Sequence, residues 1–512
     1  MSGVALLAVD IGTTAIKAAV YSADGRPLSV KTAPNRALRP RPGWSEQDMD
    51  EVWRAARACI ARAVAGSDAA NIAAIGVCGQ GDGLWALDAD LRPVRNAVLW
   101  NDSRADELVL DWIQSGVSAR LSRICRTSNW AGTAATIFRW LKDNEPQAAQ
   151  RVERVLFCKD WINLKLTGAL ATDFSDASIP FLDLEARVYA DEAFDLLDVA
   201  ELKGKLAKPR RAVDLAGSLS PGVAAELGLR SGLPVAVGAI DLGAMMTGMR
   251  LADAGDVGLI LGTTAMVNVV VAPAPFAGEP IGATICHPFE DRWIRVIAPL
   301  SGTSTLDWFA SLHRASVGGG EPSEAAKRVS ELAREVPPGA HGVSFLPFLA
   351  GERAPFVAPQ ATASFSGLKA SSTLADLARA VMEGTAFSLR HCFEATGIER
   401  PESTFLTGGG ARNRLWCDIL ANALGAEIVA SDASDHGLWG IALIAAAAAG
   451  LGDVKTHPPR AEATRKHAPE PRAAAAYDSL FELYQQGVAA SQRAWPSQRA
   501  VERRLETIRG SS

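Results

Sequence analysis

The sequence has no paired cysteine motif. Its seven cysteines are scattered singly, and no two of them form a Cys-x-x-Cys element. An odd, unpatterned set of cysteines is typical of a reducing compartment and offers no ligand spacing for structural zinc. We therefore expect a cytoplasmic protein without a zinc site.

Long hydrophobic runs are also absent. The longest apolar run, Ile441–Ala449, is too short to cross a membrane, and its alanine content predicts a packed helix. Asp10 interrupts the first apolar run, so that run does not resemble a secretion signal. The sequence therefore predicts no membrane partner.

Positive charge is not in excess. The chain carries 52 Lys and Arg against 57 Asp and Glu, a formal net charge of −5, and it has no basic stripe. This balance argues against a nucleic-acid partner. A hydrophobic content of 48% over 512 residues indicates a globular protein of two large domains or three smaller ones.

The most informative stretch that is present lies near the N-terminus. Two short apolar runs flank Gly12-Thr13-Thr14, which predicts a β-hairpin with these residues at its tip. Gly12 allows close approach of a ligand, and the threonine hydroxyls and tip amides suit phosphate oxygens. Asp10 ends an apolar strand, where a Mg²⁺ ion held through water would justify a carboxylate. The alternative is a tight turn with an isolated Asp.

The same pattern occurs again about 250 residues later. Gly262-Thr263-Thr264 also lies between two apolar runs. A unit repeated at such a distance indicates two similar domains, and two phosphate-binding hairpins facing each other would form a nucleotide site. No Gly-x-x-x-x-Gly-Lys-Ser/Thr element supports a P-loop alternative.

A glycine-rich segment follows the predicted strand Ile72–Cys78. It offers Gln80 and Asp82 between alternating glycines, and an amide with a carboxylate suits sugar hydroxyls. The alternative is a glycine bend with a solvated Asp. Trp100 ends another strand, where it is either a core residue or a platform for the apolar face of a sugar.

Asp241 follows the buried strand Leu233–Ile240, which we take as the start of the second domain. An Asp before a helix is commonly only an N-cap. Its position in sequence between the two hairpins favours a catalytic role. Further along, Gly408-Gly409-Gly410 precedes a predicted helix over 414–424, which is either an anion seat or a common glycine turn.

Taken together, these motifs resemble the FGGY family of carbohydrate kinases. The resemblance covers Asp10 to about Gly450 and includes the segment from Ala363 to Glu383, which matches the C-terminal signature of the family. The N-terminal signature differs at Ala134 and Ile137.

The resemblance implies an α/β fold of two actin-like, ribonuclease-H-like domains flanking a cleft for nucleotide and sugar. We expect an N-terminal domain over 1–237, a C-terminal domain over 238–450, and a connector with helices over 451–512. The oligomeric state is not specified by the sequence, and a homodimer is the candidate assembly.

The resemblance also implies ATP and Mg²⁺ as cofactors, with Asp10 positioning the metal and Asp241 acting as the catalytic base. Contacts to the nucleotide are implied for Gly12, Thr13, Thr14, Lys17, Gly262, Thr263, Thr264, Gly302, Gly408, Gly409 and Asn413. Contacts to the sugar are implied for Gln80, Asp82, Trp100, Asn129 and Asp241.

The implied activity is phosphorylation of a terminal hydroxyl of a linear sugar or polyol. The Gly81-Asp82 pair resembles the erythritol kinase branch, whereas Pro42-Gly43-Trp44 resembles L-xylulose kinases. Erythritol, L-xylulose and xylulose therefore all stay open as substrates. The alternative function is a non-catalytic sugar sensor or an actin-like ATPase.

Overall fold

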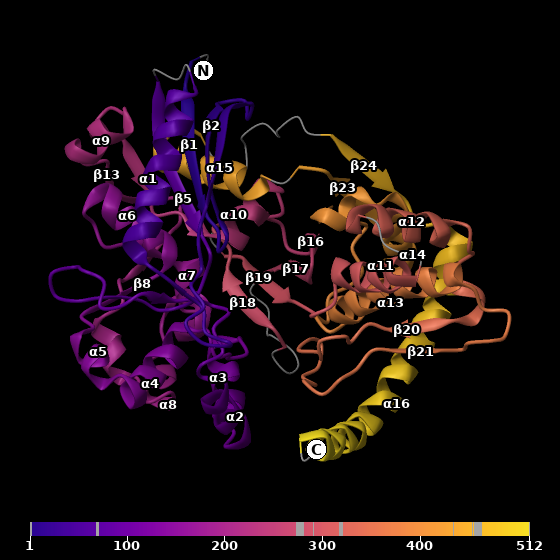
Figure 1. The fold of residues 1–512 in the computed structure, drawn as a ribbon. Coiled ribbons are helices and arrows are strands. Elements are labelled where there is room, and N and C mark those ends of the chain that lie inside the picture. The colour runs from indigo at the N-terminus through magenta and orange to yellow at the C-terminus, as the bar shows by residue number, and fades with distance from the viewer. Residues whose placement is uncertain are drawn as a thin grey trace.

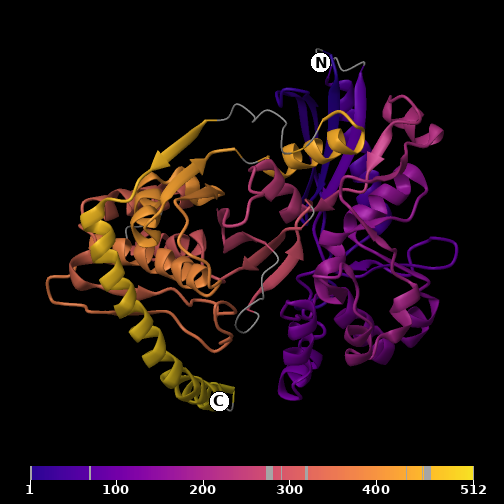
Figure 2. The same cartoon turned by 180° about the vertical axis from the view of Figure 1, so that it is seen from behind.

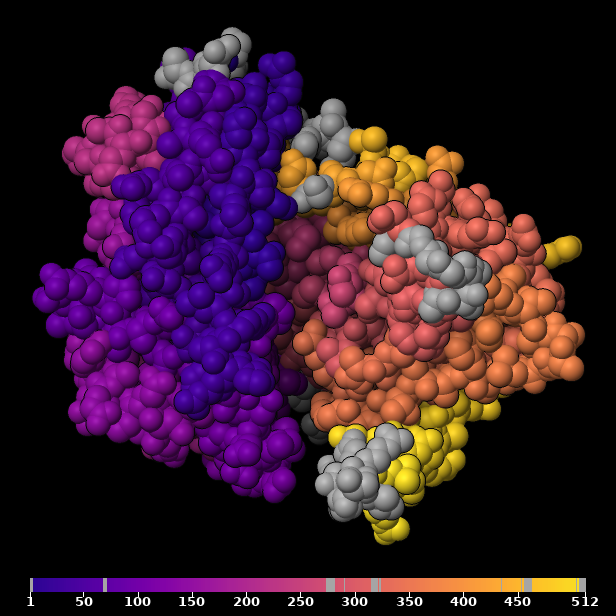
Figure 3. Space-filling view, viewed as in Figure 1, coloured from indigo at the N-terminus to yellow at the C-terminus, as the bar shows by residue number. Residues whose placement is uncertain are grey.

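The computed structural model describes residues 3–67, 71–272, 281–289, 291–316, 321–433, 435–452, 454 and 463–510. Figure 1 shows two lobes, each built around one mixed sheet and covered by helices. In the space-filling view a groove separates the indigo and purple lobe from the orange lobe (Figure 3).

The first sheet contains the predicted N-terminal hairpin. β1 (Ala5–Ile11) and β2 (Ala15–Ser22) pair antiparallel, with Asp10 opposite Lys17, so the hairpin prediction is confirmed. The strand order is β13 (Leu215–Ser218), β14 (Pro234–Ala236), β5 (Ile72–Gly79), β1, β2 and β3 (Pro27–Pro34). The apolar side chains of β1 and β5 are buried on both faces, which explains their nearly continuous hydrophobic runs.

The second sheet repeats this arrangement. Its order is β18 (Ala283–Cys286), β19 (Trp293–Ile297), β17 (Ala265–Val271), β16 (Val257–Leu261), β22 (Ser403–Thr407), β23 (Glu427–Ser431) and β24 (Thr464–His467). β16 and β17 form an antiparallel hairpin, and β16 pairs parallel with β22 as β1 pairs with β5. The two lobes therefore share the topology that the repeated motif predicted.

The run Leu233–Ile240 is buried extended chain, as expected, but it does not begin the second sheet. It divides into β14 and β15 (Ala239–Ile240), and both pair parallel with β5 of the first sheet. Gly238 separates them with φ 79°, and a Cβ there would lie 2.0 Å from the Val77 carbonyl oxygen. An apolar run shows that a strand is buried without showing which sheet buries it. The predicted boundary between the two domains, at residues 237 and 238, is not tested by this pairing and stays a prediction.

One helix from late in the chain completes the first lobe. α15 (His436–Ala448) packs on β1 and β5, so closely that a Cβ on Gly76 would lie 2.4 Å from the Ile441 carbonyl oxygen. Tyr21 of β2 donates a hydrogen bond of 2.8 Å to Asp435 and packs edge-on against Trp439. Figure 2 shows this helix, coloured yellow-orange, beside the indigo strands. The predicted packed helix is thus present, but its core is that of the first lobe.

α15 also contacts α10 (Asp241–Gly248), which follows β15 directly. A Cβ on Gly440 would lie 1.8 Å from the Ala244 carbonyl oxygen, and one on Gly248 would lie 1.9 Å from the His436 carbonyl oxygen. The two helices therefore pack backbone against backbone, which only glycine permits at these positions.

The other helices of the first lobe surround the sheet and a lower subdomain (Figure 1). They are α1 (Met49–Ala65), α2 (Asp106–Gln114), α3 (Val117–Cys125), α4 (Ala134–Asn144), α5 (Pro146–Arg151), α6 (Cys158–Thr167), α7 (Phe174–Phe181), α8 (Asp191–Leu196) and α9 (Pro221–Leu227). Short strands join them: β4 (Glu46–Gln47), β6 (Trp85–Leu87), β7 (Ala97–Val98), β8 (Arg154–Leu156), β9 (Thr172–Asp173), β10 (Leu182–Asp183), β11 (Val188–Tyr189) and β12 (Pro209–Arg210).

The second lobe is covered by α11 (Thr303–Ser316), α12 (Pro322–Arg334), α13 (Leu374–Glu394), α14 (Arg414–Leu424) and α16 (Pro471–Gly510), with β20 (Ser344–Leu346) and β21 (Ser364–Ser366) as a small ribbon. α16 is one continuous helix within the segment 451–512, for which the sequence predicted a connector with helices. Its Tyr477, Phe481, Tyr484 and Trp495 pack into the core of this lobe. Within the described part of the chain, no helix is both long and apolar enough to span a membrane.

Candidate active site

Three carboxylates lie at one edge of the first sheet because three parallel strands end there. Asp10 is near the end of β1, Asp82 is in the loop after β5, and Asp241 follows β15. The register places Asp10 and Ala239 both opposite Cys78, on either side of β5. The carboxyl ends of parallel strands are where α/β folds commonly bind ligands.

Burial raises the pKa of all three carboxyls, and two of them also respond to a neighbouring carboxylate. Burial and the nearby charge of Asp10 raise the pKa of Asp241 to about 7. Burial and the charge of Asp241 raise the pKa of Asp82 to about 8. Burial also raises the pKa of Asp10, against the opposing effect of Lys17. Groups with such shifts in a cleft are candidates for acid–base chemistry.

This arrangement suits a divalent cation that keeps most of its ligands outside the protein. In the described residues, no cluster of three or more His, Cys, Asp or Glu side chains is placed to hold a metal alone. Mg²⁺ is commonly held by one or two carboxylates together with water and substrate phosphates. The repulsion between Asp10 and Asp241 would be relieved by a cation at Asp10, so the residues present fit this metal.

The first hairpin tip is fixed by its neighbours. Gly12 N–H donates to the Ala15 carbonyl at 3.0 Å, and Asn35 Nδ2 donates to the Gly12 carbonyl at 2.8 Å. Thr14 is exposed at the tip. The Thr13 hydroxyl, expected to face phosphate, instead donates to Gln80 Oε1 at 2.9 Å.

The second hairpin is supported from behind by the start of α11. Thr303 N–H donates to the Gly262 carbonyl at 2.7 Å, while Thr263 and Thr264 are exposed. A Cβ on Gly302 would lie 2.5 Å from the Gly262 carbonyl oxygen and 2.6 Å from that of Thr263. Gly302 therefore lets the helix start lie directly against the hairpin.

The glycine loop before α14 packs beside this second hairpin. Gly408 has φ 97°, and a Cβ there would lie 2.7 Å from the carbonyl oxygen of Leu261, the last residue of β16. Gly409 begins a short 3₁₀ turn and has open space around it. The Asn413 side chain accepts a bond from Trp416 N–H and donates to Ser330 at 2.9 Å, so it caps α14 in this structure.

The residues predicted to contact sugar come from three adjoining segments. Asp82 has a positive φ of 56°, and Trp100 is 39% exposed. A Cβ on Gly132 would lie 1.8 Å from the Trp100 carbonyl oxygen, and Gly83 N–H donates to the Gly132 carbonyl at 2.9 Å. The Asp82 loop, the Trp100 loop and the turn carrying Asn129 therefore pack against one another.

Asn129 differs from its neighbours because its side chain is already engaged. Its Nδ2 donates to the Thr136 hydroxyl and its Oδ1 accepts from the Thr133 hydroxyl, both at 3.0 Å. These bonds fix the start of α4. In this structure the Asn129 side chain stabilises the start of α4. A contact between Asn129 and the sugar stays a prediction.

The Trp100 loop is held by a buried ionic cluster. Asp102 pairs with Arg104 at 2.8 Å, and the Arg104 guanidinium lies 3.9 Å from the ring centroid of Trp44. Trp44 packs edge-on against Trp140 of α4. Asp102 is therefore part of the support for Trp100.

Sequence reasoning missed two residues near the site. Gln47 is buried and hydrogen-bonds with both Thr13 and Gln80, and its own segment carries no signal for either contact. Trp130 packs against a buried apolar cluster that contains Ile240 of the first lobe and Ile285 of the second. Its position directly after Asn129, a predicted sugar contact, was a signal that could have identified it.

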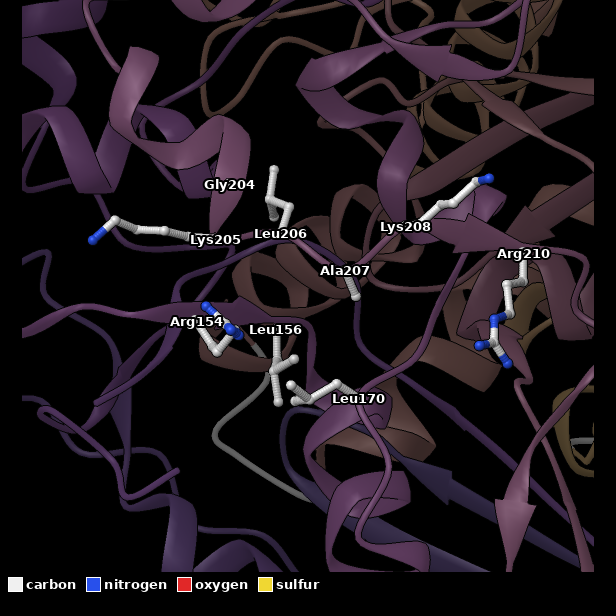
Figure 4. A pocket seen from close by; sticks show the side chains of 9 residues that line it. All are labelled: Arg154, Leu156, Leu170, Gly204, Lys205, Leu206, Ala207, Lys208 and Arg210. Atoms are coloured by element: carbon white, nitrogen blue, oxygen red, sulfur yellow. The ribbon is translucent and has the colours of Figure 1, made fainter. Parts of the chain in front are cut away.

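A separate cavity of about 320 Å³ lies elsewhere on the first lobe. It is lined by residues of β8 and of the segment 204–210, together with Leu170, and by none of the predicted site residues. Figure 4 shows Lys205 and Lys208 extending away from each other, with leucines between them. Its cations do not converge on a common point, so the sheet edge remains the candidate active site.

Comparisons with known families agree with this architecture. The model of the N-terminal domain of the FGGY family of carbohydrate kinases matches residues 5–248, and the model of the C-terminal domain of that family matches residues 257–449.

Individual relatives match along almost their whole length. A xylulose kinase of Escherichia coli K12 is 31% identical over 94% of this chain and 98% of its own. An L-xylulose/3-keto-L-gulonate kinase of the same organism is 28% identical over 95% of this chain and 97% of its own. An erythritol kinase of Brucella abortus is 28% identical over 96% of this chain and 97% of its own.

The fold is also that of a solved structure. A ligand-bound xylulose kinase from Lactobacillus acidophilus superposes with a TM-score of 0.89 at 24% identity, covering 96% of this chain and 99% of that one.

Proposed function

The chain belongs to the FGGY family of carbohydrate kinases, and from this premise we propose that it transfers the terminal phosphoryl group of ATP to a terminal hydroxyl of a linear, uncharged sugar or polyol. The observation that carries the proposal is the meeting of Asp10, Asp82 and Asp241 at one sheet edge beside the first hairpin.

Asp241 is the proposed base. With a pKa of about 7, a large fraction of this carboxyl is ionised at neutral pH while it still binds a proton well. A base with a pKa near the working pH is suited to accept the proton of the attacking hydroxyl. Its Oδ1 accepts a bond of 2.6 Å from Leu242 N–H, which holds the carboxyl at the start of α10.

Positioning of the nucleotide is proposed for the two hairpins and the glycine loop. Phosphoryl transfer depends on positioning and on neutralising charge, with little covalent work for the protein. The exposed tips at Thr14, Thr263 and Thr264 offer amides and hydroxyls for this purpose. Asp10 and Lys17 face each other behind the first tip, where bound Mg²⁺ would supply charge neutralisation.

The sugar is proposed to bind at Asp82 and Trp100. A carboxyl with a pKa of about 8 is mostly neutral at pH 7 and donates a hydrogen bond to a sugar oxygen. The exposed part of Trp100 provides an apolar wall. None of the proposed sugar residues is a cation, which argues against a sugar acid or a sugar phosphate.

This chemistry favours erythritol or a pentulose such as L-xylulose or xylulose. By their names, the relatives above are kinases of xylulose, of L-xylulose and 3-keto-L-gulonate, and of erythritol. Identity near 30% does not separate these substrates, so erythritol, L-xylulose and xylulose all stay candidates.

The test is ADP release measured with ATP, Mg²⁺ and a panel of erythritol, L-xylulose, D-xylulose, glycerol and gluconate. We expect a kcat/KM at least tenfold higher for one of the first three than for glycerol or gluconate. Activity with gluconate alone, or with no member of the panel, would contradict the proposed pocket.

A further inference from the structure

The residues that directly precede Asp82 and Asp241 contact each other. Gly81 lies in the loop after β5, and Ile240 is the last residue of β15. A Cβ on Gly81 would lie 2.1 Å from Ile240 Cδ1 and 2.8 Å from Ile240 Cγ1. The Ile240 side chain therefore occupies the space that any side chain at position 81 would need.

The backbone conformation does not explain why position 81 is glycine. Gly81 does not have the left-handed φ that favours glycine, whereas the next two residues do, with φ 56° at Asp82 and 74° at Gly83. The contact with Ile240 is therefore what restricts this position to glycine.

Ile240 is held in place from its other side. It is 7% exposed, and its N–H donates to the Ser175 hydroxyl at 3.0 Å. Ser175 in turn donates to Asp173, whose carboxylate lies 3.0 Å from the fully buried ammonium group of Lys159. Breaking a buried ion pair is costly because it leaves one charge without its partner. The backbone at Ile240 is therefore anchored to a buried ionic cluster.

The two carboxyl groups that flank this contact differ in how readily they move. Asp241 begins α10, which packs backbone against backbone on α15. Asp82 lies in a loop and has a glycine on either side of it. Loops of this kind move more readily than packed helices. A change at the contact should therefore displace the Asp82 loop before it displaces Asp241.

We propose that Ile240 is a positioning residue whose side chain sets the spacing between the Asp82 loop and Asp241. The inference rests on the proposed kinase function, in which Asp82 binds the sugar and Asp241 takes the proton of its hydroxyl. A misplacement of about 1 Å in such a site can cost about 100-fold in rate. A contact that fixes the spacing of the two carboxyls therefore affects how the sugar is held.

The experiment is a double-mutant cycle of Gly81→Ala and Ile240→Ala. Steady-state kinetics are measured on the full-length protein with ATP, Mg²⁺ and the best substrate among erythritol, L-xylulose and D-xylulose. Gly81→Ala pushes the loop away from Ile240, and we expect a sugar KM raised at least about tenfold. Ile240→Ala leaves the loop without support, and we expect a sugar KM raised about 2- to 10-fold. The KM for ATP should stay within about twofold in both variants, because the nucleotide is assigned to other segments.

The double variant separates a positioning role from a loss of packing alone. With Ala at both positions, the added methyl group enters the space that the Ile240 side chain has left. We therefore expect a sugar KM at least about tenfold below the product of the two single effects. Ile240→Val, which lacks only Cδ1, takes the place of Ile240→Ala in the cycle if the Ala variant does not fold.

The matched control is Gly217→Ala in β13. A Cβ on Gly217 would lie 3.0 Å from Thr167 Cβ, which is also a side chain of the first lobe but belongs to none of the predicted site residues. We expect this variant to lower the unfolding temperature, as Gly81→Ala does, and to keep the sugar KM of the wild-type protein.

Three results would overturn the inference and leave the kinase assignment intact. They are an unchanged sugar KM in Gly81→Ala, single effects that simply multiply in the double variant, and the same rise in sugar KM in Gly217→Ala as in Gly81→Ala. If no sugar of the panel supports ADP release by the wild-type protein, the proposed function fails and the inference fails with it.

Discussion

At the scale of single residues, the cost of burying negative charge governs the candidate site. Burial raises the pKa of Asp10, Asp82 and Asp241, and the charge of a neighbouring carboxylate raises the pKa of Asp82 and Asp241 further. Such an arrangement costs stability in the free protein and is retained where the charges serve chemistry. The residue-scale predictions follow from these three side chains.

Replacing Asp241 with Asn tests the proposed base. The amide still accepts the Leu242 N–H bond, so α10 keeps its start, but it cannot accept the proton of the sugar hydroxyl. We expect kcat to fall by about 10²- to 10⁴-fold, with the KM for ATP and sugar changed little. Steady-state kinetics measure both, and a kcat close to that of the wild-type protein would remove Asp241 from this role.

The pH dependence of kcat/KM should follow the same two carboxyls. Asp241 acts when ionised, so activity should rise as the pH rises through about 7. Asp82 donates to the sugar when neutral, so activity should fall as the pH rises through about 8. The measurement is a profile of kcat/KM from pH 5.5 to 9.5. In Asp82→Asn the decrease in kcat/KM above pH 8 should disappear, while the increase through pH 7 should remain. A flat profile over this range would contradict both assignments.

Replacing Asp82 with Ala tests the sugar pocket. Loss of a buried hydrogen-bond partner costs about 1–3 kcal/mol, which corresponds to a sugar KM raised roughly 5- to 150-fold. The KM for ATP should change little, because the nucleotide is assigned to other segments. An unchanged sugar KM would show that this loop does not contact the sugar.

At the scale of elements, backbone contacts set the geometry of the second hairpin, which is proposed to bind phosphate. Gly302 allows α11 to begin directly against Gly262 and Thr263. Gly302→Ala forces the hairpin and the helix start apart, and we expect a KM for ATP raised at least about tenfold, with the sugar KM little changed. Gly222→Ala in α9 is the matched control, since a Cβ there meets nothing within 4 Å. A similar change in both variants would rule out the hairpin as the cause.

The sequence was sufficient to predict the elements whose signals are local. The hairpin at Gly12, its repeat at Gly262 and the helix after Asn413 each carry their apolar pattern and turn chemistry within a few residues. The meeting of Asp10, Asp82 and Asp241 also follows from local signals once the parallel pairing is assumed.

Contacts between distant segments were not predictable in this way. Gln47 and Gln80 are 33 residues apart, and nothing in either segment indicates that they share a hydrogen bond. The bonds of Asn129 to Thr133 and Thr136 are local, yet the residue types alone did not indicate that Asn129 would serve the start of α4. Polar side chains have several partners available, and only the folded arrangement selects among them.

At the scale of the whole molecule, three connections join the lobes. They run from α10 to β16, from β23 to α15, and from α15 back to β24 of the second sheet. Because α10 and α15 pack backbone against backbone, they belong to one unit with the first sheet. The lobes also touch directly, since Cys286 N–H of β18 donates to the Ser178 hydroxyl of α7 at 2.9 Å. Movement of the second lobe must therefore be accommodated in these connections and at this contact.

Closure of the groove is expected when sugar binds, because a kinase must keep water away from the phosphoryl group. Small-angle scattering of the protein with and without its best sugar should show a smaller radius of gyration with sugar. A non-substrate sugar at the same concentration is the control. Identical scattering curves in both conditions would count against closure.

The return of α15 to the first sheet also has a consequence for how the chain is made. When residue 248 leaves the ribosome, the face of β1 and β5 that α15 covers in the finished protein is still bare. Some 200 further residues, or roughly 10–40 s of synthesis, must pass before that helix emerges. During this interval the apolar face of the first sheet stays exposed to solvent on the nascent chain. We therefore expect chaperones that act during translation to bind the first lobe.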